Sequence, residues 1–281
     1  MSKQATEFQR KEMSRMYRGK QIFKPLNTGW IDERVACVRE WVANLFFYRK
    51  GDTTIMIDAG YNYDRLAEKM SWLGIRPQEI DSILVTHQDT DHVGAVEADS
   101  PGLFKNATLY VGEIENRYLT GEARRRVIYH LYRLPQVTIN NKKALLHDGQ
   151  TLEIGGVRIE CFLVPSHTWG HMVYLIDDKY LFTGDTLWFG ADGGYSFISA
   201  LAEDNVWRCV RLTRWRISCA RGGSGRSSSP ATPAGRTISS SPSPIRISSV
   251  RPSESACPIP ARPMTRTTNR TTRRSGRSPA S

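Results

Sequence analysis

Two histidines and two aspartates lie within six positions of one another, just after an apolar segment. They are His87, Asp89, Asp91 and His92. The apolar segment, residues 82–86, is typical of a short buried strand. A strand end is rigid, and the turn after it can fold side chains inward, so that alternate residues approach one metal ion while the adjacent pair reaches a second. Mixed imidazole and carboxylate groups suit hard or borderline divalent metals. The spacing therefore predicts a metal site in preference to a polar surface loop.

The same arrangement occurs twice more along the chain. His167 and His171 come directly after the predicted strand at residues 157–164. Asp185 follows another predicted strand, residues 180–183. A single histidine or aspartate in such a place would be weak support for a metal site. Three strand-end segments in this order support it strongly.

The elements that must position these residues form an α/β pattern from about residue 30 onward. Turn signals such as Gly155-Gly156 and Asp177-Asp178 separate the apolar runs. The predicted strands are residues 44–48, 53–57, 82–86, 108–111, 152–154, 157–164, 172–176 and 180–183, and the predicted helices are residues 63–73 and 122–134. Because the strands come in runs with helices between the runs, we expect helices packed outside sheets instead of a simple doubly wound sheet.

The order of these motifs resembles that of the metallo-β-lactamase-fold superfamily, which includes glyoxalase II-like hydrolases and lactonases. The matching residues are Asp58 in the run Ile57-Asp58-Ala59-Gly60, followed by His87, Asp89, Asp91, His92, His167 and Asp185. The resemblance covers about residues 30–205. It implies an αββα four-layer sandwich with a binuclear metal site at one edge of the sheets, here with an incomplete C-terminal half.

The resemblance implies two divalent metal ions, with His87, Asp89 and His167 holding the first and Asp185 bridging both. Most members of the superfamily carry a histidine where this chain has Asp89. Zinc is the expected metal. A carboxylate is a harder ligand than imidazole, so Asp89 favours iron or manganese more than a histidine would, and these two metals are the alternatives. A water or hydroxide between the metals would be the nucleophile, because two cations lower its pKa and polarise the bond that it attacks.

In the same scheme Asp91 and His92 hold the second metal. Asp91 would also orient the nucleophilic water or accept a proton from it. Asp58 would fix the metal-binding loop through hydrogen bonds to its ligands or backbone, and a simple turn carboxylate is the alternative interpretation. We expect His171 to lie behind the ligands or in the core and not to bind metal.

The implied activity is hydrolysis of a small-molecule ester, thioester, lactone or phosphodiester. The same site chemistry serves all four classes, so the fold and the ligands do not choose among them. Two alternatives stay open. Asp89 favours a non-haem di-iron redox or sensor protein, because superfamily members that bind two irons carry a carboxylate there. The chain could also be a catalytically impaired frameshift product, because no histidine follows His171 to supply the family's final metal ligand.

The last part of the chain differs sharply in composition. The formal net charge is +11, yet residues 1–205 hold 24 basic and 27 acidic side chains, a net charge of −3. Residues 206–281 hold 15 Arg, no Lys and one acidic residue, a net charge of +14. This Arg/Ser/Pro-rich tail lacks hydrophobic periodicity, so we expect it to be disordered or read out of frame. The expected organisation is a lead-in at 1–28, a truncated domain at 29–205 and the tail at 206–281.

The genetic code offers support for a frameshift near residue 205. Codons that straddle residues 229–239 can encode Thr-Gly-His-Thr-Gly-Trp-Thr-Asp-Asp-Phe in the neighbouring frame, which places a Gly-His pair where the family has its final ligand. A basic arm that binds nucleic acid is the alternative interpretation. The tail lacks lysine and aromatic residues interleaved with its arginines, so we expect no nucleic-acid partner.

Composition also bears on the compartment. No apolar run approaches the length needed to span a membrane, and residues 1–20 contain no apolar core of a secretory signal. The five cysteines form no CxxC pair, which argues against a disulfide framework and suits a reducing compartment. We therefore expect a cytoplasmic protein without a membrane partner, and the sequence indicates no particular oligomeric state.

Overall fold

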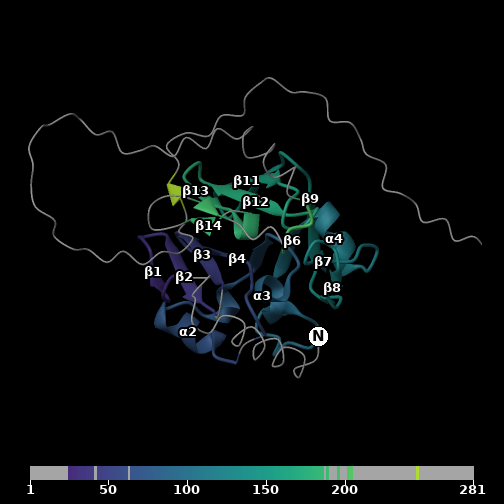
Figure 1. Cartoon of the computed structure of the whole chain (residues 1–281). Coiled ribbons are helices and arrows are strands. Elements are labelled where there is room, and N and C mark those ends of the chain that lie inside the picture. The colour runs from purple at the N-terminus through teal and green to yellow at the C-terminus, as the bar shows by residue number, and fades with distance from the viewer. Residues whose placement is uncertain are drawn as a thin grey trace, which may run out of the picture.

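A larger sheet and a smaller sheet lie against each other in the computed structural model, which describes residues 25–40, 43–62, 64–186, 188–189, 195–196, 201–204 and 245–246 (Figure 1). The larger sheet has the order β1-β2-β3-β4-β5-β6-β9. Its strands are β1 (Gly29–Trp30), β2 (Val35–Arg39), β3 (Asn44–Lys50), β4 (Thr53–Ile57), β5 (Ser82–Val85), β6 (Thr108–Gly112) and β9 (Lys143–Leu146). Pairing is antiparallel from β1 to β4 and parallel from β4 to β9.

The smaller sheet is antiparallel throughout, with the order β10-β11-β12-β13-β16. Its strands are β10 (Thr151–Ile154), β11 (Val157–Leu163), β12 (Met172–Ile176), β13 (Tyr180–Phe182) and β16 (Ile245–Arg246). The turns expected at Gly155-Gly156 and Asp177-Asp178 are present, and all four residues have positive φ, as hairpin turns that match the strand twist require. A separate two-stranded sheet joins β14 (Trp188–Phe189) to β15 (Tyr195–Ser196).

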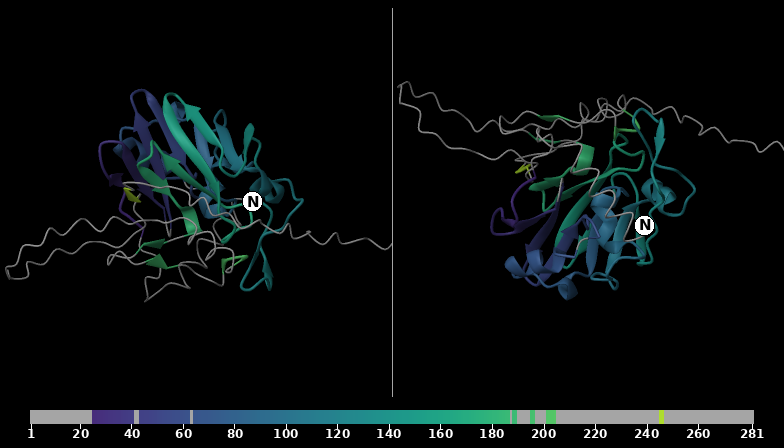
Figure 2. Two further views of the ribbon diagram at one scale, coloured as in Figure 1. Left: turned by 90° about the horizontal axis from the view of Figure 1, so that it is seen from above. Right: turned by 60° about the horizontal axis from the view of Figure 1, so that its bottom comes forward.

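Short helices cover the face of the larger sheet that points away from the smaller one (Figure 2). They include α2 (Leu66–Trp72), α3 (Thr90–Val93) and α4 (Glu113–Leu119), with single 3₁₀ turns at Pro77–Glu79 and Gly94–Val96, whereas the 3₁₀ turn at Gly184–Thr186 follows β13 of the smaller sheet. Leu66 and Met70 of α2 are fully buried against this face. This arrangement of helices outside sheets is the one expected from the sequence.

A second apolar core fills the space between the two sheets. Tyr48 and Ile57 of the larger sheet belong to the same buried cluster as Tyr174 and Tyr180 of the smaller sheet. Their burial removes large aromatic and aliphatic surfaces from water, while each tyrosine hydroxyl keeps a hydrogen-bond partner. The hydroxyl of Tyr48, for example, donates to Asp177 over 2.7 Å. This core holds the two sheet edges in a fixed relation, which the site described below depends on.

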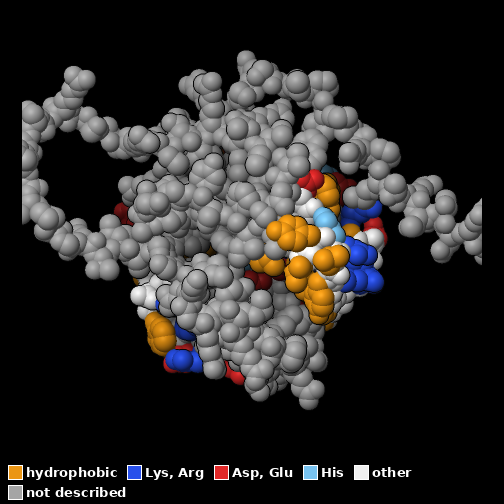
Figure 3. Space-filling model, in the orientation of Figure 1, with side chains coloured by type: hydrophobic (Ala, Val, Ile, Leu, Met, Phe, Trp, Pro, Cys, Tyr) orange, Lys and Arg blue, Asp and Glu red, His pale blue; other side chains and the backbone are white. Residues whose placement is uncertain are grey.

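The helix predicted at residues 122–134 is wrong. The segment forms a hairpin of β7 (Arg126–Val127) and β8 (Tyr132–Arg133), with three consecutive positive-φ residues at its tip. Its large apolar side chains lie exposed over β7 and β8 (Figure 3) and include Tyr129 and Leu131. Among the described residues, nothing covers the apolar side chains at the tip of this segment, since Ile128 and Leu131 stay exposed. A buried ion pair of Arg125, described below, fixes the chain where the hairpin begins.

The strand ends gather at one edge of the sheets. Because β4 and β5 are parallel with Ile57 beside Leu84, the residues that follow them emerge side by side. The amide of Met172, at the start of β12, donates to the carbonyl of Thr86 over 2.8 Å, so the smaller sheet meets the larger at this point. Within the described residues, no helix combines the length and apolar character that crossing a bilayer requires.

Candidate metal centre

The loop after β5 is tied to the loop after β4 by backbone hydrogen bonds. The amide of Ala59 donates to the carbonyl of His92 over 2.6 Å, and the amide of Gly94 donates to the carbonyl of Gly60 over 2.6 Å. The helix α3 begins at Thr90, so the neighbouring Asp91 and His92 project from a short rigid turn. These bonds fix where the side chains of the loop can point.

The loop between β11 and β12 approaches the same place from the smaller sheet. The two ends of this loop are joined to each other, because the amide of Val164 donates to the carbonyl of His171 over 2.8 Å. Gly170 lets this loop lie directly on the start of α4, since a Cβ atom there would collide with the backbone nitrogen of Glu115. His167 is thereby brought next to the loop after β5.

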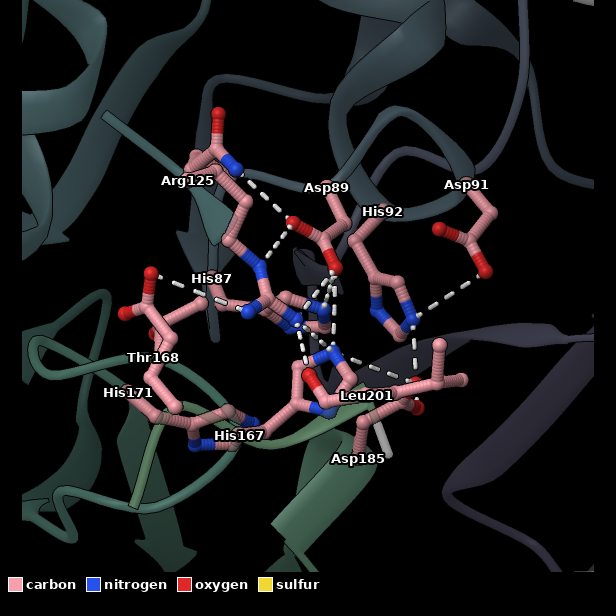
Figure 4. A network of polar contacts seen from close by, with 12 residues as sticks. His87, Asp89, Asp91, His92, Arg125, His167, Thr168, His171, Asp185 and Leu201 are labelled. Atoms are coloured by element: carbon pink, nitrogen blue, oxygen red, sulfur yellow. Dashed lines mark hydrogen bonds and ion pairs between the residues drawn. The ribbon is translucent and has the colours of Figure 1, made fainter. Parts of the chain in front are cut away.

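Five of the predicted site residues form two overlapping groups whose potential donor atoms lie within 4.8 Å of one another (Figure 4). The first cluster is His87, His167 and Asp185, and the second cluster is Asp91, His92 and Asp185. Asp185 belongs to both, the place that a bridging ligand would occupy. The rings of His87 and His92 are 4.0 Å apart at their centroids, so the two clusters adjoin.

Buried imidazole nitrogens face into both clusters without a hydrogen-bond partner. They are Nε2 of His87 in the first cluster and Nε2 of His92 in the second. In each ring the other nitrogen is engaged: Nδ1 of His87 lies 3.0 Å from the hydroxyl of Thr86, and Nδ1 of His92 lies 2.8 Å from Asp58. Such a partner orients the ring and leaves Nε2 for a metal. Unpaired buried polar atoms are rare and need an explanation, and a bound cation supplies one.

The protonation of these groups suits ligation. Burial, with the nearby charges of His92 and His167, holds the pKa of His87 well below its usual value, so its ring stays neutral and keeps its lone pair. Burial alone would lower the pKa of His92, but the carboxylates of Asp185, Asp58 and Asp91 outweigh it and raise the pKa well above its usual value. A divalent cation placed among those carboxylates would displace that proton.

The two carboxylates of the second cluster differ in acidity. Burial and the nearby carboxylates of Asp185 and Asp89 raise the pKa of Asp91 to about 6, against the opposing charge of His92. Burial would also raise the pKa of Asp185, but its contacts with His92 and the charge of His167 hold that pKa below its usual range. One carboxyl group is therefore suited to exchanging a proton near neutral pH, and the other stays ionised.

Asp58 makes the hydrogen bonds that its expected supporting role needs. It accepts hydrogen bonds from the Thr86 amide at 2.7 Å and from the Thr86 hydroxyl at 2.8 Å, and it lies 2.8 Å from His92 Nδ1. His171 belongs to neither cluster. Its ring is fully buried and stacks on His87 at a centroid distance of 5.0 Å, with Nδ1 3.1 Å from the hydroxyl of Thr186.

Asp89 lies beside the first cluster and also forms an ion pair with the guanidinium of Arg125. Its Oδ2 is 3.0 Å from Nε2 of His167 and 3.7 Å from Nε2 of His87. Arg125 donates to both of its oxygens, from Nε to Oδ1 over 2.9 Å and from Nη2 to Oδ2 over 3.1 Å. Burial would raise the pKa of Asp89, but the charges of Arg125 and His167 hold it well below the usual range.

Sequence reasoning missed two residues of this site, Arg125 and Glu115. Glu115 on α4 is fully buried and accepts hydrogen bonds from the amide of Gln88 over 2.7 Å and from the hydroxyl of Thr168 over 2.6 Å. It therefore joins the two loops that carry the histidines. Neither residue has a local sequence signal, because their partners lie tens of positions away along the chain.

Replacing Glu115 with glutamine should make stability less sensitive to pH. Burial raises the pKa of Glu115 from 4.5 to about 8, so the folded protein keeps a proton that the unfolded chain releases. The free energy of unfolding of the wild type therefore falls as pH rises through this window. Glutamine mimics the neutral acid and removes that loss. Urea unfolding at about pH 5 and about pH 8 measures the difference, and equal pH dependence in both proteins would contradict it.

Comparison with known proteins bears on the family and the fold. The model of the metallo-beta-lactamase superfamily matches residues 38–228, and it confirms the fold expected from the motifs. A probable polyketide biosynthesis zinc-dependent hydrolase, BaeB, of Bacillus velezensis is 28% identical over 164 residues, which cover 58% of this chain and 63% of the relative. A hydroxyacylglutathione hydrolase of Pseudomonas aeruginosa is 32% identical over 136 residues, which cover 47% of this chain and 43% of the relative.

The chain therefore spans between 43% and 63% of the length of these two curated relatives. Among solved structures, the subclass B3 metallo-beta-lactamase MEM-A1 from a soil metagenome library aligns with a TM-score of 0.46 at 18% identity. That alignment covers 54% of this chain and 58% of the other.

Proposed function

The chain belongs to the metallo-beta-lactamase superfamily, and from this premise we propose that it is a metal-dependent hydrolase of small-molecule esters, thioesters, lactones or phosphodiesters. The observation that carries the proposal is the pair of clusters that share Asp185, with buried imidazole nitrogens facing into each without a hydrogen-bond partner. Relatives named as zinc-dependent hydrolase and as hydroxyacylglutathione hydrolase support the same reaction class.

The proposed centre holds two divalent ions. His87, His167 and Asp89 would hold the first ion, and Asp185, which belongs to both clusters, would contribute to both sites. Zinc is the proposed metal, because the first group offers two imidazole nitrogens and because relatives are named as zinc-dependent. When bound, the metal supplies Lewis acidity, which lowers the pKa of water and polarises the substrate oxygen.

The protein's own residues supply orientation and proton transfer. Asp91 and His92 would complete the second cluster, and Asp91 would orient the attacking water or accept its proton. Asp58 holds His92 and the loop after β5 in place through its hydrogen bonds to Thr86 and to the ring. His171 supports the ring of His87 from behind.

Removal of metal tests the proposal. The full 281-residue chain, loaded with zinc, should hydrolyse at least one member of a panel of acyl-glutathione, ester, lactone and phosphodiester substrates. Treatment with a chelator should abolish hydrolysis, and added zinc should restore it. Elemental analysis should find about two ions per chain. Hydrolysis that persists in a chain shown to be free of metal would overturn the assignment.

A non-haem di-iron redox or sensor protein is the second candidate, and Asp89 is the observation that favours it. Its carboxylate lies 3.0 Å from His167, and a carboxylate favours iron more than an imidazole does. An iron-loaded chain with a visible absorption band and reversible reduction, together with no hydrolysis of the panel, would favour this candidate over the first.

The C-terminal composition belongs to the same proposal. We infer that residues 206–281 are read out of frame and that the frame-corrected chain supplies the family's final histidine ligand. The codons of the gene decide this directly: a neighbouring frame that does not encode the Gly-His pair refutes it. We also place the protein in the cytoplasm, without a nucleic-acid partner. Cys37 and Cys161, both buried free thiols, fit a reducing compartment.

A further inference from the structure

Arg125 is a buried cation at the edge of the first cluster. Its residue is 2% exposed, although it lies one position before the exposed hairpin of β7 and β8. The guanidinium makes a two-pronged contact with Asp89, from Nε to Oδ1 and from Nη2 to Oδ2. Its Nη1 donates to the carbonyl of Arg126 over 2.9 Å and lies 3.8 Å from Glu203. Contacts on every side therefore fix the position of this charge.

The same guanidinium engages the nitrogen of His167 that would bind a metal. Nη2 of Arg125 is 3.0 Å from Nε2 of His167 (Figure 4), and it also donates to the carbonyl of Leu201 over 2.7 Å. A neutral imidazole has one acceptor lone pair. The same Nε2 also lies 3.0 Å from Oδ2 of Asp89, so it either accepts a hydrogen bond from Arg125 or donates one to Asp89. In either arrangement this nitrogen cannot bind a metal until the contact is released.

The second cluster has no such competitor. Within the described part of the chain, the hydrogen bonds and ion pairs of Asp91, His92 and Asp185 involve no arginine or lysine. The Nε2 atom of His92 has no hydrogen-bond partner and lies 3.3 Å from Asp185 and 3.8 Å from Asp91. Two carboxylates and an imidazole therefore face one another with no arginine or lysine against them.

We propose that Arg125 makes the two clusters unequal in metal affinity. Its guanidinium donates to both oxygens of Asp89 and lies against Nε2 of His167, so it must move before His87, Asp89 and His167 can hold a divalent cation, and its charge repels that cation. The cluster of Asp91, His92 and Asp185 therefore fills first, and the cluster beside Arg125 fills at higher metal concentration. The inference rests on the proposed metal centre and assigns Arg125 the role of a positioning residue that sets metal occupancy.

A zinc titration of the full-length chain against a chromophoric chelator tests this order. The wild type should bind zinc in two steps of different affinity. Arg125→Met should tighten the weaker step by at least about tenfold, because a full charge is removed next to the ligands, and should change the tighter step by less than about threefold. Arg124→Met is the matched control, because its exposed side chain contacts Gln136 and not the clusters. It should leave both steps unchanged.

Arg125→Met leaves the Asp89 carboxylate buried without its cation, which can prevent folding. A measurement on the wild type keeps the test decisive in that case. The side-chain Nε–H signal of Arg125 can be assigned in the NMR spectrum by its loss in Arg125→Lys. It should stay in place during the first equivalent of zinc and shift during the second, when the guanidinium moves. A signal that never moves, or that moves with the first equivalent, overturns the proposal.

The outcomes separate this inference from the proposed function. If the wild type and both variants bind no zinc, the metal centre itself is wrong, and the inference falls with it. If zinc binds in two equal steps, or if Arg125→Met leaves the weaker step unchanged, the metal centre stands and only the role of Arg125 is refuted.

Discussion

Replacing Asp91 with alanine should lower the rate of hydrolysis by about 10³-fold while the protein stays folded. The change removes a carboxylate of the second cluster together with the group proposed to accept a proton, and loss of a positioned acid or base alone costs about 10²- to 10⁴-fold. The Asp91 side chain is 22% exposed, and its ion-pair contact is with His92 at 3.8 Å, so the core loses little packing.

Steady-state kinetics on the preferred substrate measures this effect, and circular dichroism checks the fold. Asp91→Asn keeps the shape of the side chain but cannot accept the proton, so it should be nearly as inactive as the alanine variant. Asp81→Ala, which removes an exposed carboxylate outside the site, should retain wild-type turnover. Hydrolysis at the wild-type rate in both Asp91 variants would refute the catalytic role.

The sequence indicated the candidate metal centre because its proposed ligands are local. His87 to His92 fall within one turn, and each of the other ligands follows a strand that hydrophobicity and turn residues mark clearly. Parallel pairing of β4 and β5 then brings Asp58 beside Thr86 without any further information. Strand ends and short ligand spacings are properties of a few consecutive residues, so pattern reasoning can find them.

Arg125 could not be found in the same way. Its contacts with Asp89 and Leu201 join positions far apart in the chain, and tertiary packing alone decides them. The spacing of apolar residues around it favoured a helix, yet the structure has a hairpin that leaves Leu131 84% exposed. A pattern indicates which residues can share a face, but it does not indicate whether another surface is there to receive that face.

Replacing Asp58 with alanine should lower the free energy of unfolding by about 3–5 kcal/mol, the range seen when one partner of a buried charged pair is removed. Asp58 is 4% exposed and is bonded to the amide and the hydroxyl of Thr86 and to Nδ1 of His92. Alanine leaves the Thr86 amide without this acceptor and the His92 ring without its anchor. Residue 58 also has a left-handed backbone conformation, with φ 57°. Alanine has no polar side chain to support this conformation, which costs about 1–2 kcal/mol.

Asp58→Asn separates the hydrogen bonds from the charge. Asparagine tolerates the same backbone conformation and can still accept from Thr86, so we expect it to lose less stability than alanine loses. It removes the negative charge that favours the protonated His92 ring, so the pKa of His92 should fall relative to the wild type. Urea unfolding gives the stabilities, and NMR titration gives the histidine pKa. If both variants were as stable as the wild type, Asp58 would be no more than a turn carboxylate, and the loop that carries His92 would have to be held in place by its backbone bonds alone.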